Sequence, residues 1–134
     1  KDFYYGNILT LKNNVLIPKH TFITKPEFGK FNIAHPALFI NKSAFDDVKG
    51  FNITYKVCSD ADFELKLIRS GKSSKKIDAF ISVFRSGGFS DLNPQKVEEA
   101  KRIYKSHNAM NWKYRVQIYK FLLLWFYRKC IKNE

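Results

Sequence analysis

Two carboxylates are separated by one residue in the stretch "VCSDADFELKLIRSG", residues 57–71, at Asp60 and Asp62. Carboxylate pairs of this kind can bind a divalent cation through their hard oxygen atoms. One carboxylate can instead act as a general base that removes a proton from a hydroxyl group. Both can also serve the start of a helix, where Ser59 and Asp62 have capping-box spacing and negative charge is stabilised.

The spacing by itself favours the capping role for Asp60 and Asp62. A metal-binding pair in a sugar-nucleotide enzyme usually follows a hydrophobic strand, and the preceding segment "NITYKVCS" is a poor match to a buried strand. We therefore predict no metal site in this chain. A base role stays compatible with the pattern, because a helix N-terminus keeps a carboxylate ionised and oriented.

Two further segments have residue types that suit a binding site. His35 precedes a proline in the apolar run "AHPALFI", where a core or loop role is commoner than catalysis. The segment "RSGGFS", residues 85–90, has two glycines that permit a tight turn and close backbone approach to a ligand. Arg85 suits a phosphate group. A plain surface loop is the alternative for this segment.

The elements that must position these residues follow from local pattern. The apolar runs and their flanking turn and cap residues predict strands and helices that alternate along the chain. A three-turn helix from Ser59 to a stop at Gly71 carries Phe63 and Leu67 on one apolar face. The other expected elements are short strands within 2–23 with a turn at 12–14, a buried strand at 34–40, a short helix from about 41 to Gly50, a strand from 75, and helices over 94–109 and 111–134.

Composition places limits on the fold and on the partners. The 134 residues are 45% hydrophobic and 16% aromatic, enough for one domain with its own core. A formal charge of +12 suggests an anionic partner such as a nucleic acid, an acidic membrane or a phosphorylated ligand. Cys58 and Cys130 lie far apart without a Cys/His cluster, which favours two reduced thiols in a cytoplasmic protein.

The basic charge is concentrated near the C-terminus. Residues 101–134 contain nine Lys or Arg and one acidic residue, giving +8 of the total +12. Trp112, Val116, Tyr119, Leu123 and Phe126 recur there at helical spacing. A basic amphipathic helix of this kind can lie on an anionic membrane surface, or it can pack on the domain or on another subunit. No window reaches the ~18 apolar residues of a membrane span, and no secretory signal is recognisable.

Five segments occur in an order that resembles a known family. They are "YG" at 5–6, "HPALF" at 35–39, "KGF" at 49–51, "DFELKL" at 62–67 and "FRSGGFS" at 84–90. Together they resemble the second half of the catalytic domain of family 2 glycosyltransferases, in the branch that builds bacterial surface polysaccharides. The resemblance covers residues 2–90, roughly two thirds of the chain.

The resemblance implies an α/β fold, namely a partial GT-A fold with a mixed sheet, flanking helices and a C-terminal helical tail. Residues 1–92 would form the acceptor-side half of the domain, and residues 93–134 the basic amphipathic helices. The activity implied is transfer of a sugar from a nucleotide-diphosphate sugar to a glycan or lipid-linked acceptor. Asp62 would be the catalytic base, and Asp60 has no assigned role.

The resemblance also implies ligand contacts and a missing half. His35 would line the pocket, and Arg85, Gly87, Gly88 and Ser90 would cover the donor or the acceptor. The family's N-terminal half, with the nucleotide-binding strands and the ligands for Mg²⁺ or Mn²⁺, has no counterpart here. We therefore expect a fragment that is inactive alone and works in the cytoplasm, peripherally at the inner face of the cell membrane.

Two alternatives belong to other functional classes. Charge and aromatic content are compatible with a small basic nucleic-acid-binding module. The aromatic residues fall mostly in apolar runs, however, and no nucleic-acid motif is recognisable, so we expect no nucleic-acid partner. The other alternative is a non-catalytic domain that dimerises through its C-terminal helix. A homodimer would also cover the face that the missing half leaves exposed.

Overall fold

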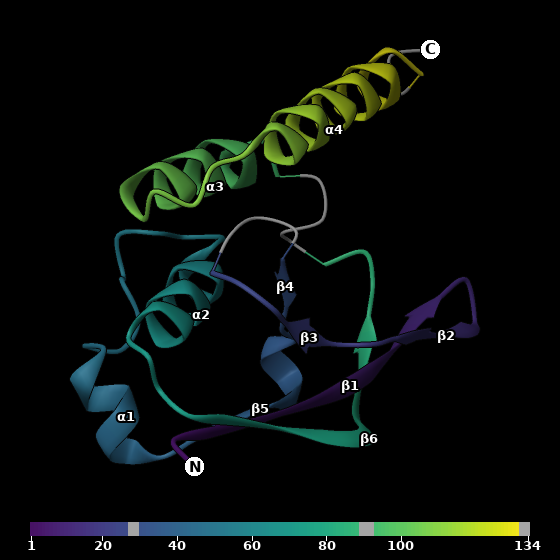
Figure 1. The fold of residues 1–134 in the computed structure, drawn as a ribbon. Helices are drawn as coiled ribbons and strands as arrows, with labels where there is room; N and C mark the ends of the chain where they lie inside the picture. The colour runs from purple at the N-terminus through teal and green to yellow at the C-terminus, as the bar shows by residue number, and fades with distance from the viewer. Residues whose placement is uncertain (27–29, 89–92, 132–134) are drawn as a thin grey trace.

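The computed structural model describes residues 1–26, 30–88 and 93–131. Strand β1 (Phe3–Lys12) is the centre of a mixed sheet. It pairs in parallel with β6 (Ser74–Arg85) and antiparallel with β2 (Val15–Lys19) and β5 (Leu38–Ile40). Strands β3 (Phe22–Ile23) and β4 (Phe31–Asn32) form a second, two-stranded sheet. The α/β class with a mixed sheet is therefore confirmed (Figure 1).

Four α-helices were expected in the chain, and the described residues contain all four. They are α1 (Lys42–Asp47), α2 (Ser59–Arg69), α3 (Gln95–Ser106) and α4 (Trp112–Ile131). The expected single strand over 34–40 is wrong, because it begins as a short 3₁₀ helix, η1 (His35–Ala37), before β5. Pro36 explains this, since its ring fixes φ near the helical value and removes a backbone donor.

The glycine of the tyrosine-glycine pair in β1 is required by close packing against β6. The register between β1 and β6 shifts on either side of Asn7, and here the two strands approach closely. A Cβ atom placed on Gly6 would lie 2.2 Å from Cγ1 of Ile81 and 3.3 Å from the carbonyl oxygen of Ala79. Only glycine fits this approach. The buried Asn7 side chain accepts a hydrogen bond of 3.0 Å from the backbone N–H of Thr21.

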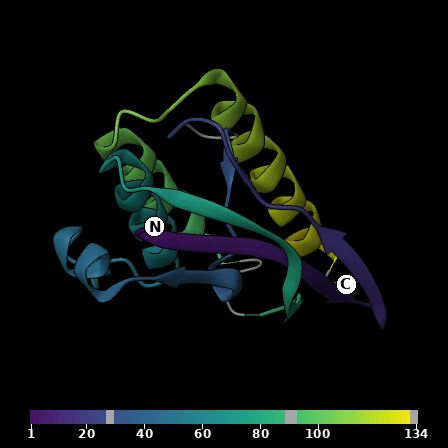
Figure 2. The same cartoon turned by 60° about the horizontal axis from the view of Figure 1, so that its bottom comes forward.

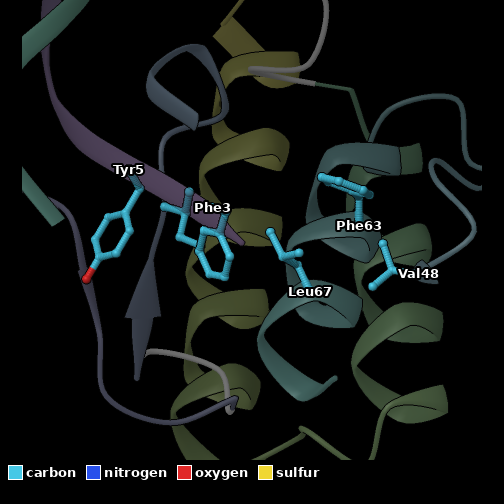
Figure 3. Packing of buried hydrophobic residues seen from close by; sticks show 6 residues of the cluster. Phe3, Tyr5, Val48, Phe63 and Leu67 are labelled. Carbon is cyan, nitrogen blue, oxygen red and sulfur yellow. The ribbon is translucent and has the colours of Figure 1, made fainter. Parts of the chain in front are cut away.

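Helix α2 is buried on two sides. Phe63 and Leu67 pack with Phe3 of β1 in the main core, and Figure 3 shows Phe3 pointing toward Leu67. On the other side, Leu65 packs with Ile103 of α3 in a second cluster. The expectation of one docked apolar face is therefore wrong. Helix α3 covers the second side, so α2 lies between the sheet and α3 (Figures 1 and 2).

A buried carboxylate of α3 holds the chain where α2 begins. Both oxygens of Glu99 accept backbone hydrogen bonds, from the N–H groups of Lys56, Val57 and Cys58 at 2.8, 2.9 and 2.9 Å. Consecutive N–H groups of this kind form an anion-binding nest. Burial opposes ionisation of Glu99, but the three N–H groups and Arg102 outweigh it and lower the pKa of this carboxyl.

The expected capping of α2 by Ser59 and Asp62 is wrong. Ser59 is the first helical residue rather than the N-cap, which is Cys58 and makes no side-chain hydrogen bond to the helix. The Asp60 carboxylate accepts a hydrogen bond of 2.8 Å from the N–H of Ala61, as a capping residue can. The Asp62 carboxylate has different partners, so the capping box is not formed. The start of α2 is fixed mainly from outside by Glu99.

Replacing Glu99 by glutamine tests the nest. Glutamine keeps one acceptor oxygen but turns an NH₂ group toward backbone donors, which leaves buried N–H groups unpaired. We expect Glu99→Gln to lower the unfolding free energy by about 2 kcal/mol in urea denaturation at neutral pH. Glu98→Gln is the matched control, because Glu98 is the exposed neighbour on α3. Equal stability of the two variants would contradict the assignment.

The same carboxylate predicts a pH dependence. The pKa of Glu99 is lower in the folded chain than its usual value of 4.5. Its stabilisation is therefore fully present above that value and is lost as the pH falls through the folded pKa. The stability difference between the wild type and Glu99→Gln should shrink over this acidic range. A difference that stays constant from neutral to acidic pH would exclude a charge-dependent role.

Candidate functional site

Asp62 is a buried carboxylate that faces the end of α3. The residue is 3% exposed. Oδ1 lies 3.0 Å from Nε2 of His107, and Oδ2 lies 2.6 Å from Nζ of Lys66, one turn further along α2. Because an ionised carboxylate only accepts hydrogen bonds, the His107 ring donates to it. One charged oxygen of Asp62 is thus held by a ring from a helix 45 residues away in sequence.

His107 is the part of this cluster that the sequence did not reveal. It forms the C-cap of α3, and its backbone N–H donates to the carbonyl oxygen of Ile103. Its ring reaches Asp62 because Glu99 and the α2–α3 packing fix how the two helices lie together. The sequence signal for His107 was limited to its place at the end of a predicted helix.

The second oxygen of Asp62 is paired with Lys66. Oδ2 lies 2.6 Å from the Lys66 ammonium nitrogen, and within the described residues no other donor is bonded to it. The Lys66 side chain is partly exposed, so it covers this oxygen from the solvent side. A buried charge is costly unless it is paired, and Lys66 and His107 supply that pairing for Asp62.

His35 belongs to a second cluster on another side of α2. Its Nδ1 atom lies 3.9 Å from Oε1 of Glu64, too far for a hydrogen bond. The His35 ring also contacts Phe51 edge-on, with centroids 5.5 Å apart. Since Asp62 and Glu64 are two residues apart, they point about 200° apart around the helix. The structure therefore places Asp62 and His35 in two separate clusters, one on each side of α2.

Glu64 is a titratable residue that the sequence reasoning passed over. Burial raises the pKa of this carboxyl well above its usual value, and the negative charge of Asp60 adds to that effect. Lys19 acts in the opposite direction. A carboxyl that holds its proton can donate as well as accept a hydrogen bond. The His35–Glu64 cluster therefore offers hydrogen-bonding groups beside aromatic rings.

The D-x-D pair does not form a metal centre. Asp60 is exposed and bonds the Ala61 N–H, while Asp62 is buried against His107 and Lys66. Across the part of the chain that the structure describes, no three His, Cys, Asp or Glu side chains converge as ligands. The donor set here does not fit a bound Mg²⁺ or Mn²⁺, so a cation used by a larger enzyme needs other ligands.

The glycine segment follows strand β6. Arg85 is the last residue of β6 and pairs with Leu11 of β1, and the Ser86 N–H donates to the Leu11 carbonyl oxygen at 3.1 Å. Gly87 has a φ of 96°, and a Cβ on Gly88 would meet open space. Ser90 lies outside the described residues.

The glycine segment and the turn that carries His35 both lie against β1, at different positions along the strand. The turn that carries His35 packs on Ile8 through Ala34 and Ala37. Arg85 pairs with β1 three residues beyond Ile8, or about 10 Å along the strand.

Cys58 is not a nucleophile in this arrangement. The thiol is buried and free of a disulfide. Burial, with the charges of Asp60 and Glu99, raises the pKa of Cys58 to about 11. The residue therefore stays a protonated, apolar thiol at neutral pH, and it packs in the cluster between α2 and α3.

Replacing Glu64 by glutamine tests its raised pKa. Because the folded pKa lies above the unfolded value, this carboxyl favours the folded state at acidic pH and loses that contribution as the pH rises through the folded pKa. We expect Glu64→Gln to raise the unfolding free energy relative to the wild type at neutral pH, and to match it near pH ~4.

Urea denaturation at both pH values measures the Glu64 effect. Glu98→Gln again serves as the exposed control and should be silent at both. A Glu64→Gln variant that is less stable than the wild type at neutral pH would show that the ionised carboxylate has a stabilising partner.

Comparison of the chain with protein-family models, with curated proteins and with solved structures found no match.

Proposed function

We propose that this chain is the acceptor-side half of a glycosyltransferase catalytic domain of family 2, with a GT-A fold. The observation that supports it most is the convergence of segments that lie far apart in sequence. The His35 ring of "HPALF" lies 5.5 Å from the Phe51 ring of "KGF". Phe51 in turn lies 4.6 Å from the Phe63 ring of "DFELKL". Three of the five segments thus meet at one cluster.

Two glycines are consistent with the same proposal. Gly6 of the "YG" segment is required where β1 and β6 approach, and Gly50 of "KGF" has a φ of 56° after helix α1. A Cβ on Gly50 would lie 2.7 Å from the Phe45 ring. Each glycine thus has a local structural reason. These reasons are shared by any protein with this packing, so they support the proposal less than the convergence does.

Asp62 is the proposed catalytic base. In an inverting transfer, the base takes the proton of the acceptor hydroxyl as that oxygen attacks the anomeric carbon of the donor. Oδ2 is the proposed proton acceptor, with the Lys66 ammonium group as its partner in the absence of substrate, and His107 holds Oδ1. Lys66 covers Oδ2, so displacement of this one side chain gives the hydroxyl access. The nucleotide-diphosphate leaving group departs toward the half of the domain that lies outside this chain.

The remaining residues are proposed to contact sugars. His35 and the buried Glu64 present hydrogen-bonding groups beside the Phe51 ring, which suits sugar hydroxyl groups and a ring face. Arg85, Gly87, Gly88 and Ser90 are proposed to cover the donor or acceptor. The nucleotide and the divalent cation would be bound by residues outside this chain, and the acceptor would be a glycan or a lipid-linked intermediate.

The proposed enzyme acts in the cytoplasm, peripherally at the inner face of the cell membrane, in surface-polysaccharide synthesis. Within the described residues, no helix combines the length and apolar character of a membrane crossing. The first test is the sequence that precedes Lys1 in the gene product. A nucleotide-binding segment that ends in a D-x-D motif supports the proposal. Absence of such a segment from both the gene product and its stable partners contradicts it.

Asp62→Asn in the complete enzyme tests the base assignment. We expect sugar transfer to fall by at least about 100-fold, because the amide cannot accept the hydroxyl proton. His107→Gln should cost less, about tenfold, because it positions Asp62 rather than reacting. Release of the nucleotide diphosphate in the presence of acceptor measures both. Asp60→Asn is the matched control, since this exposed carboxylate lies outside the cluster.

Stability has to be measured beside activity. Asp62 is a buried, ion-paired charge, so its loss leaves Lys66 without its partner and is expected to cost about 1–3 kcal/mol of unfolding free energy. Activity is therefore compared at a temperature where denaturation curves show every variant to be folded. Near-normal transfer by folded Asp62→Asn would remove the base assignment.

A further inference from the structure

Helix α4 carries a row of large apolar side chains on one exposed side. The row consists of Trp112, Val116, Tyr119, Leu123 and Tyr127, which we call the α4 stripe. We propose that the α4 stripe docks the protein, with the helix lying parallel to the surface, on a membrane that contains anionic lipid. The inference rests on α4 alone and does not depend on the glycosyltransferase proposal.

The stripe is narrow and continuous. At 100° per residue, its five side chains fall within an arc of roughly 80°. All five are exposed, from 43% for Val116 to 70% for Trp112 and Leu123. The stripe extends over about 22 Å of helix, one residue per turn or nearly so. Contiguous exposed apolar surface of this size marks an interaction site more often than a solvated face.

Cations flank the stripe on both sides. On the same helical projection, Lys113 and Lys120 border one edge and Arg115 borders the other. All three side chains are exposed. The Lys113 ammonium group lies 5.9 Å from the centre of the Trp112 ring, so its aliphatic stem runs along the edge of the stripe. Long basic side chains beside an apolar row can keep their charge at lipid headgroups while their stems stay in the interface.

The geometry fits a helix in the plane of the interface. Across the described residues, no helix is long and apolar enough to span a bilayer, and Lys113, Arg115 and Lys120 border the apolar row of α4. Trp112, Tyr119 and Tyr127 are amphipathic rings of the type that sit at headgroup depth. An anionic surface adds electrostatic attraction of about 1 kcal/mol for each Lys or Arg near it, and Lys113, Arg115 and Lys120 border the stripe.

Charge argues against the other occupants. A second copy on the stripe would bring together two segments that each carry +8, and the like charges would repel. A nucleic acid would be attracted by the cations, but phosphate contacts do not use an apolar row. A membrane with anionic lipid matches both features, because it offers apolar depth beneath a layer of negative charge.

Vesicle flotation with the full 134-residue chain tests the proposal. The vesicles are phosphatidylcholine alone and phosphatidylcholine mixed with phosphatidylglycerol. We expect at least about tenfold stronger partitioning to the anionic vesicles, weakening with salt. In a Trp125→Phe background, Trp112 is the remaining tryptophan, so its emission should shift to the blue on binding and be quenched by lipids brominated near the headgroup.

Two pairs of variants distinguish a contribution of the α4 stripe from the overall hydrophobicity and net charge of the chain. Leu123→Glu should reduce partitioning about tenfold, while Ile53→Glu, at an apolar site that is 82% exposed, should leave it unchanged. The double variant Lys113→Glu/Lys120→Glu should remove the preference for anionic lipid. The control Lys75→Glu/Lys76→Glu on β6 makes the same change in net charge at exposed lysines and should retain most of it.

Several results would overturn the proposal. Equal recovery with neutral and anionic vesicles would exclude charge-dependent docking. Equal loss in the α4 and β6 charge variants would show a general charge effect. A concentration-dependent dimer that Leu123→Glu dissociates would assign the stripe to a second copy of the chain. Binding to generic RNA or DNA that competes with vesicles and survives Leu123→Glu would assign the cations to a nucleic acid.

Discussion

The hydrogen bonds that Glu99 accepts from three consecutive N–H groups connect the two parts of this fold. They join helix α3 to the turn before α2, over a sequence separation of 41 to 43 residues. A buried carboxylate without hydrogen bonds would destabilise the fold, and so would three buried N–H groups without acceptors. The contact supplies hydrogen-bond partners to both. This contact fixes where α2 begins, and every residue of the candidate site on α2 takes its direction from that start.

Placing α2 between the sheet and α3 gives its carboxylates different surroundings. Asp62 faces the end of α3 and is paired with His107 and Lys66. Glu64 faces the turn of His35, and burial raises its pKa. Two carboxyl groups on one helix thus have different partners and belong to different clusters, one on each side of α2.

The C-terminal helix is physically unlike the rest of the chain. In the body of the protein, aromatic residues such as Phe3 and Phe63 are buried and meet other rings. On α4, Trp112 and Tyr119 are exposed beside cations. The expected domain boundary at residue 92 groups α3 with α4, but these two helices have different surroundings. Helix α3 packs on α2 and contributes His107 and Glu99, whereas α4 carries the proposed membrane contact.

Much of the local structure could be read from the sequence, because it depends on neighbours within a few residues. The turn at Asn13-Asn14, with positive φ at both residues, and the helix that ends before Gly71 follow from backbone preferences. The apolar spacing of Phe63 and Leu67 likewise identified one buried side of α2. The same reasoning missed the second side, since Leu65 is buried by Ile103, a residue that no local pattern connects to it.

Local patterns in the sequence predict the helices, the central strands and the basic C-terminus, and they identify Asp62 as a candidate residue. The packing of distant segments places His107 against Asp62, Glu99 rather than Ser59 at the start of α2, and Glu64 beside His35. The two kinds of information differ in the range of the interactions behind them. Helix periodicity and turn preferences act over a few residues, whereas a carboxylate takes its partner from whichever chain segment packs against it.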